Sequence, residues 1–167
     1  MGHATHVRLG AVVITLVLLG ACNEGGGAPP PPQAPQPPKT ILDGTLPATQ
    51  QTPTTPLAYV FRSEKAARDT LTYIDAVQRS SFHAEAPLVA VLGGSRPDSG
   101  YRVLFRSFDH ESPGPVVVTA DVERKGGLAA QVFSVPYILV SLPGFTLGDA
   151  TDCELRLGDR TFRCSVV

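Results

Sequence analysis

Continuous and alternating hydrophobic stretches predict a β-sheet in the second half of the chain. Residues 88–92 are wholly apolar over a strand length, which is typical of a strand buried on both faces. In residues 101–106, apolar side chains alternate with arginine, as in a strand with one buried face. The connection, residues 93–100, contains Pro97, Asp98 and Gly100, with Gly100 able to adopt a positive φ. The pattern therefore predicts a hairpin around this turn.

A helix is predicted before this hairpin. Residues 57–61 have the composition of a short strand, and Ser63 is suited to cap a helix whose first turn begins with Glu64. One apolar stripe at helical spacing follows, formed by Ala66, Ala67, Leu71, Tyr73, Ile74 and Val77. We expect one helix with this stripe packed on the sheet.

Two further strands are expected, over residues 115–123 and 128–142. In the first, alternate positions are apolar from Val116 to Val122. The second contains Pro136, which cannot donate a ladder hydrogen bond, so we expect an edge strand, a break or a bulge there. Together these elements predict an α+β domain, a small and mostly antiparallel sheet with one packed helix.

The N-terminal segment has the pattern of an export signal. A short polar start is followed by apolar residues 9–19, too few to span a bilayer as a helix, which takes about 20. The signal ends in Leu-Gly-Ala-Cys, which resembles a bacterial lipobox. The resemblance implies a signal peptide over residues 1–21, a lipid on Cys22, and an exported protein anchored to the membrane of the cell envelope through that lipid. An ordinary secretory signal that happens to contain a cysteine is the alternative.

A linker is predicted after the signal. Residues 22–56 are rich in proline, glycine, threonine and glutamine, and this composition offers little apolar surface to bury. We therefore expect a disordered, proline-rich linker over residues 22–56 and one folded domain over residues 57–167.

The chain ends in a predicted hairpin, residues 152–166, around a turn at Gly158 and Asp159. This turn places Cys153 opposite Cys164, at a separation that suits a disulfide. With Cys22 lipidated, these two remain as an even pair in an oxidising compartment. Free or metal-binding thiols are the alternative.

Charge and motifs restrict the function. The chain has 14 Lys+Arg and 15 Asp+Glu, a net charge of −1, without a basic cluster, which argues against a nucleic-acid partner. No cofactor, metal or catalytic motif is present; Ser95 stands in a Gly-Ser-Arg sequence that lacks the second glycine of a nucleophile elbow. We expect a protein that is not an enzyme. A hydrolase would need Ser95, Asp98 and His110 to come together.

Residues 88–143 resemble the C-terminal domain of the PrcB family. The turn resembles that family's Gly-x-Arg-Pro-Thr-Gly-Gly-Tyr sequence, and a later Pro-Tyr pair also corresponds. The departures are Asp98 and Ser99, where Thr and Gly are usual, and the terminal cysteine hairpin. The matching residues are Arg96, Pro97, Gly100, Tyr101, Pro136 and Tyr137.

The resemblance implies a function in the envelope. Members of the PrcB family are envelope lipoproteins, named for a subunit that stabilises a secreted serine-protease complex. It implies a non-enzymatic lipoprotein that binds protein, as an accessory subunit of a protease or other envelope complex. Arg96, Tyr101 and Tyr137 are the candidate partner contacts, with purely structural roles as the alternative. A module that binds glycan or peptide is the second hypothesis; an exposed aromatic cleft would favour it, whereas an apolar patch or open sheet edge beside Pro136 would favour a protein partner.

Overall fold

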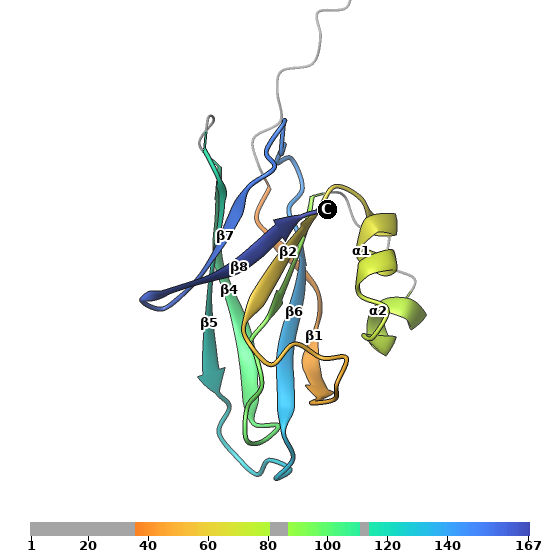
Figure 1. Cartoon of the computed structure of the whole chain (residues 1–167), viewed down its shortest axis with the longest axis vertical. Helices are drawn as coiled ribbons and strands as arrows, with labels where there is room; N and C mark the ends of the chain where they lie inside the picture. Colours follow the sequence, from red (N-terminus) through yellow and green to blue (C-terminus); the bar gives the residue numbers. More distant parts are fainter. Residues whose placement is uncertain (1–35, 81–86, 111–113) are drawn as a thin grey trace, which may run out of the picture. The chain divides into compact units, whose positions relative to one another are not determined.

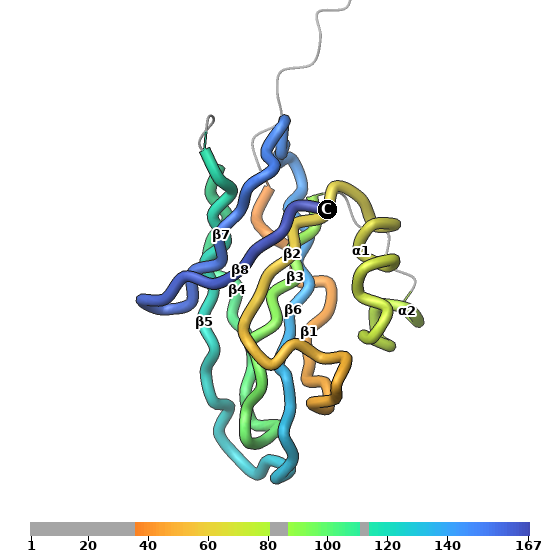
Figure 2. The backbone as a smooth tube through the Cα atoms, viewed as in Figure 1, coloured from red at the N-terminus to blue at the C-terminus, as the bar shows by residue number. Residues whose placement is uncertain are grey.

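The computed structural model describes residues 36–80, 87–110 and 114–167, and these contain one eight-stranded sheet and two short helices (Figures 1 and 2). The strand order is β1-β6-β3-β2-β8-β7-β5-β4. The strands are β1 (Lys39–Pro47), β2 (Leu57–Phe61), β3 (Leu88–Leu92), β4 (Tyr101–His110), β5 (Val116–Arg124), β6 (Ser134–Ser141), β7 (Cys153–Leu157) and β8 (Arg160–Val166), and the helices are α1 (Glu64–Thr70) and α2 (Asp75–Arg79).

Most neighbouring strands are antiparallel. Only the pairs β2–β8 and β5–β7 run parallel in the described sheet. The predicted α+β class is therefore confirmed, with two short helices where one was expected. No helix in the described part of the chain is long and apolar enough to span a membrane.

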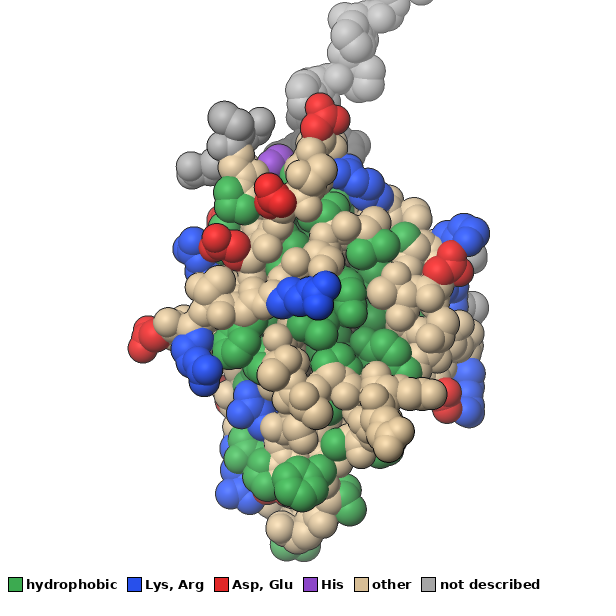
Figure 3. All heavy atoms as spheres, in the orientation of Figure 1, with side chains coloured by type: hydrophobic (Ala, Val, Ile, Leu, Met, Phe, Trp, Pro, Cys, Tyr) green, Lys and Arg blue, Asp and Glu red, His purple; other side chains and the backbone are tan. Residues whose placement is uncertain are grey.

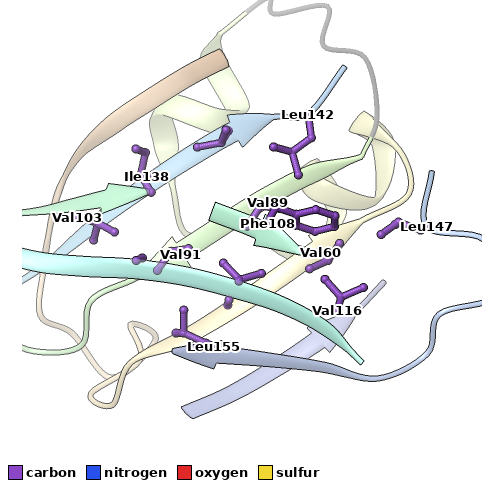
Figure 4. Packing of buried hydrophobic residues seen from close by; sticks show 14 residues of the cluster. Val60, Val89, Val91, Val103, Phe108, Val116, Ile138, Leu142, Leu147 and Leu155 are labelled. Atoms are coloured by element: carbon purple, nitrogen blue, oxygen red, sulfur yellow. The ribbon is translucent and has the colours of Figure 1, made fainter. Parts of the chain in front are cut away.

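The sheet encloses a first hydrophobic core because it bends until β4 lies against β6 and β1. Side chains from β2, β3, β4, β5, β6 and β7 gather in the space between the strands (Figure 4). Phe108 of β4 packs edge to face on Phe145, with ring centroids 5.5 Å apart. The buried members of this core include Val60, Val89, Val91, Val103, Phe108, Val116, Ile138, Leu142, Leu147 and Leu155.

A second core lies on the other face of β3 and β6, under the helices. Its buried members are Phe61, Ala67, Leu71, Ile74, Val77, Leu88, Ala90, Leu92, Val135, Tyr137 and Leu139. Because β3 and β6 contribute alternate side chains to the two cores, every residue of both strands is buried. The prediction of a doubly buried strand over residues 88–92 is confirmed.

The helical region begins as predicted and is then interrupted. The Ser63 hydroxyl accepts a hydrogen bond from the Ala66 N–H at 3.1 Å, which confirms the N-cap. The prediction of one continuous helix is wrong, because α1 ends at Thr70 and α2 begins at Asp75. The break turns both Leu71 and Ile74 into the second core, where they are almost fully buried.

Two side chains stabilise this break. The Gln78 amide donates to the Arg68 carbonyl at 2.9 Å, near the C-terminal end of α1. The Arg68 guanidinium donates to the carbonyls of Val77 at 2.6 Å and Ser80 at 2.7 Å, at the end of α2. Each helix thus has carbonyls at its C-terminal end bound by a side chain from the other.

The predicted hairpin over residues 88–106 is wrong. β3 lies between β2 and β6, whereas β4 pairs with β5 at the other end of the strand order. Residues 93–100 therefore connect two strands that are not neighbours, and we call them the crossover loop. The local turn residues predicted a reversal, but the doubly buried β3 is already paired on both sides.

Pro136 lies inside the sheet, and the prediction of an edge strand, a break or a bulge there is wrong. β6 lies between β1 and β3, and its register with β1 runs through Pro136 without a shift. The Gly93 N–H donates to the Pro136 carbonyl at 2.8 Å. In a hydrogen-bonded antiparallel pair the two residues exchange two such bonds, and proline lacks the second donor. The Arg96 guanidinium supplies it instead, donating to the Gly93 carbonyl at 2.9 Å.

Part of the predicted linker is folded. β1 (Lys39–Pro47) lies within residues 22–56, and its apolar Ile41, Leu42 and Leu46 pack on the second core. The prediction of disorder is therefore wrong from Lys39 onward, because these side chains bury enough surface to order the strand. Residues 1–35, with the signal, Cys22 and the first part of the linker, lie outside the described residues.

The C-terminal hairpin forms as predicted. Leu157 pairs with Arg160 and Leu155 with Phe162 across the turn. Gly158, the first turn residue, has φ of 56°, a conformation that favours glycine. Cys153 and Cys164 form the expected disulfide, with their Cα atoms 5.2 Å apart.

Replacement of both Cys153 and Cys164 by serine should lower the free energy of unfolding by about 3 kcal/mol, because the crosslink restricts the unfolded chain. Urea unfolding followed by circular dichroism measures this difference. Reduction of the unmodified protein should lower its urea midpoint about as far as the double substitution does. A change well below 1 kcal/mol would show that the disulfide contributes little.

Candidate functional site

Three large apolar side chains are exposed on the connection between β5 and β6. Leu128, Val132 and Phe133 have exposed fractions of 108%, 56% and 68%, and among the described residues the only other large apolar side chain in this state is Val167. We call residues 125–133 the tip loop and these three side chains the apolar tip. Hydrophobic side chains gather at this lower end of the molecule in Figure 3. Grouped exposure of this kind marks an interaction surface more often than single exposed residues do.

The crossover loop holds the tip loop in place, and Figure 2 shows the two at the same end of the sheet. The Ser99 N–H donates to the Ala130 carbonyl at 3.1 Å, and the Ala130 N–H donates to the Ser99 hydroxyl at 3.0 Å. At the start of the tip loop, the Lys125 N–H donates to the Gly100 carbonyl at 2.6 Å.

The other end of the tip loop is fixed where β6 begins. Arg96 and Ser134 form an isolated β-bridge with backbone hydrogen bonds of 2.7 and 3.0 Å. The buried Ser134 hydroxyl donates to the Asp98 carbonyl at 2.6 Å. Directly after β1, the Ala48 N–H donates to the Phe133 carbonyl at 2.9 Å. With its middle and both ends bonded, the loop presents its apolar side chains outward.

Asp98 organises the crossover loop. The residue is only 5% exposed. Its carboxylate accepts a hydrogen bond from the Gly100 N–H at 2.8 Å and forms an ion pair with Arg124 at 3.2 Å. These interactions stabilise the turn. Gly100 does not have the positive φ expected of it; a Cβ there would lie 2.8 Å from the Asp98 carboxylate and 3.0 Å from the Ala129 Cβ. Glycine is required for space.

Arg96 and Tyr101, two of the predicted partner contacts, lie together beside the crossover loop. The guanidinium carbon of Arg96 lies 5.7 Å from the centroid of the Tyr101 ring, within the range of a cation–π contact. Arg96 also donates to the Gly93 carbonyl, and its Nε is buried with no hydrogen-bond partner among the described residues. Neither side chain belongs to the apolar tip; their described contacts support the loop behind it.

Tyr137, the third predicted contact, lies elsewhere. It is only 6% exposed and belongs to the second core, with its hydroxyl against Gly44 of β1, where an added Cβ would lie 3.1 Å away. Burial, and then the nearby Asp43 carboxylate, raises the pKa of Tyr137. While β1 is in place, this ring has almost no surface to offer a partner.

The residues of the alternative hydrolase site are far apart. Ser95 and Asp98 lie in the crossover loop, just before β4 begins. His110 is the last of the ten residues of β4, so it lies about 30 Å from the start of that strand. Asp98 is committed to its own turn and to Arg124. Across residues 36–80, 87–110 and 114–167, no group of three or more His, Cys, Asp or Glu side chains could hold a metal ion.

One hollow formed by the described residues lies at the end of the sheet that contains His110. It is open and has a volume of about 810 Å³. Its lining has no tyrosine, phenylalanine or tryptophan, so it is not the aromatic cleft that a glycan-binding module would show. The lining residues are His110, Gly114, Pro115, Thr146, Gly148, Asp149, Ala150, Thr151 and Asp152.

The sequence does not reveal the apolar tip, because the apolar run predicts a strand that begins at residue 128. β6 begins only at Ser134. An apolar run before a strand does not by itself reveal that its side chains face water.

No protein-family model, curated protein or solved structure matches the chain.

Arg96→Met should lower the free energy of unfolding by about 1 to 3 kcal/mol, because the Gly93 carbonyl then lacks a donor in a buried position. Chemical denaturation measures the change. Arg106→Met is the matched control: its guanidinium is 53% exposed and pairs with Asp121 on the surface, so we expect a change within about 0.5 kcal/mol. Equal effects of the two substitutions would contradict the role assigned to Arg96.

Proposed function

We propose that this chain is an exported, non-enzymatic lipoprotein, anchored to the cell envelope through Cys22, that holds another envelope protein by its apolar tip. The apolar tip is the observation that carries the proposal. Leu128, Val132 and Phe133 face water, although the loop that bears them is bonded to its surroundings at three places. An exposed apolar group on a fixed backbone binds a partner without first ordering itself, which reduces the entropic cost of association.

The resemblance to the PrcB family adds the biological setting. Members of that family are envelope lipoproteins, and the subunit that gives the family its name stabilises a secreted protease complex. A partner that binds this chain only in its folded form gains stability by mass action. Tethering both proteins to one envelope raises their effective concentration and so strengthens a modest interface.

The described chain enters the domain at the end opposite to the apolar tip. The Gln36 N–H donates to the Pro143 carbonyl at 3.2 Å, so the described chain enters beside the far end of β6. β1 then runs nine residues, about 30 Å, before the chain reaches Ala48 and its bond to Phe133. A lipid on Cys22 would therefore join the domain at the end opposite to its binding surface.

An apolar patch beside β6 favours a protein partner over a glycan or peptide ligand. Val132 and Phe133 directly precede the strand that contains Pro136. The hollow at the other end of the sheet has no tyrosine, phenylalanine or tryptophan among its described lining residues against which a sugar could stack. The described residues also keep Ser95 and His110 at opposite ends of β4, which supports binding over hydrolysis.

Photo-crosslinking amino acids placed at Val132 and Phe133 of the full chain should capture one envelope protein in living cells. The same probe at Lys65, 85% exposed on α1, is the control and should not capture it. Mass spectrometry of the crosslinked peptides identifies both sides of the contact. Capture of the same protein equally at all three positions, or at Lys65 alone, would reject the apolar tip as the binding surface.

A double Leu128→Ser and Phe133→Ser variant separates binding from folding. Both side chains are exposed, so the free energy of unfolding should stay within about 0.5 kcal/mol of the unmodified protein. Binding to the captured protein should be lost. Unchanged binding by this folded variant would overturn the proposal.

Cys22→Ser should move the chain from the membrane fraction to the soluble fraction of the envelope, because acyl chains supply the membrane affinity. Fractionation with immunoblotting and radiolabelled palmitate incorporation measure this change. Cys153→Ser, as control, should leave the fractionation unaltered. Retention of Cys22→Ser in the membrane would contradict lipid anchoring through that residue.

A further inference from the structure

The charges around the tip loop are paired with one exception. On the sheet side, Arg102 and Glu123 form an ion pair across β4 and β5. Arg124 pairs with Asp98, 3.2 Å away. Lys125 is exposed and has no ion-pair or hydrogen-bond partner for its ammonium among the described residues. It directly precedes the apolar tip.

Lys125 is fixed in position at its backbone and open at its side chain. Its N–H donates to the Gly100 carbonyl at 2.6 Å. The two residues that follow are Gly126 and Gly127, and a Cβ at either would have no atom within 4 Å. Residues 124–133 contain no aspartate or glutamate. The apolar tip is therefore accompanied by one unneutralised positive charge and by no negative charge of its own loop.

The apolar tip alone is a small interface. Three side chains cover only part of the surface of a stable protein interface, which buries about 800 Å² on each partner. Covering Leu128 and Phe133 also brings the partner close to Lys125. A lysine ammonium that is brought against a partner loses part of its hydration. A facing carboxylate offsets this cost, so charge complementarity at this point decides which partner surfaces fit.

We infer that the partner surface is an apolar hollow with an aspartate or glutamate at its rim, and that this carboxylate pairs with Lys125. The inference rests on the proposed function and specifies the chemistry of its partner. The hollow receives Val132 and Phe133, and the rim charge steers the approach. A charge at the rim acts mainly on the association rate and on its dependence on salt.

The test uses the envelope protein captured by the crosslinks at Val132 and Phe133, purified and immobilised for biolayer interferometry. Association of Lys125→Glu should be about tenfold slower than that of the unmodified chain in about 50 mM NaCl. The difference should shrink in about 500 mM NaCl, where charges are screened within a few ångströms. Lys39→Glu is the matched control, an exposed lysine at the opposite end of β1, and it should associate like the unmodified chain.

A charge exchange then locates the carboxylate. The acidic residue nearest the crosslinked peptide of the partner is replaced by lysine, and this variant should bind Lys125→Glu better than it binds the unmodified chain. If Lys125→Glu and the unmodified chain associate equally at both salt concentrations while the Leu128→Ser and Phe133→Ser variant does not bind, the inference is overturned and the proposed function stands. If the double serine variant binds normally, the proposed function itself fails.

A membrane is the competing occupant of the apolar tip. Vesicles of phosphatidylethanolamine and phosphatidylglycerol are mixed with the full chain carrying Cys22→Ser, so that the lipid anchor does not contribute. We expect no cosedimentation. Cosedimentation that is lost in the Phe133→Ser and Lys125→Glu variants would assign the apolar tip to the bilayer and overturn a protein partner.

Discussion

The described fold depends on how a proline is accommodated between two strands. Pro136 accepts the Gly93 N–H but cannot return a donor, and the Arg96 guanidinium satisfies the Gly93 carbonyl in its place. To do so the chain must turn back immediately after β3, which brings Arg96 to Ser134 and forms the bridge that closes the tip loop. A deficit of one hydrogen bond inside the sheet thus sets the course of the crossover loop, and the course of that loop sets where the apolar tip projects.

Local patterns predicted the elements that local forces determine. The capping serine at Ser63, the alternation of β5 and the register of the cysteine hairpin each follow from residues close in sequence, and all three are confirmed. Pairing between distant segments was not predictable in this way. The turn chemistry around Pro97 is compatible with a hairpin, but β3 gains more by packing both faces between β2 and β6, so its neighbours were decided by the two cores.

For the candidate site, the sequence predicted a residue that supports the loop but not the exposed apolar side chains. Arg96 was singled out from the sequence, and the structure gives it a specific task behind the apolar tip. The sequence predicts Phe133 to be part of a strand. A hydrophobic side chain tends to be buried, but the sequence does not show whether the core of its own domain or a partner buries it. β1 was not predicted, because the proline-rich segments before Lys39 and after Pro47 both have the composition of a linker.

The antiparallel pairing of β1 with β6 has a mechanical consequence for a tethered protein. On the proposed function, tension from the anchor would enter β1 at Lys39, and tension from a partner on Phe133 would enter β6 at Ser134, the opposite end of the same pair. The two strands would then be pulled past one another along their length, so the hydrogen bonds of the pair would share the force instead of opening one after another. β1 would thus transmit the load between the proposed anchor and the partner.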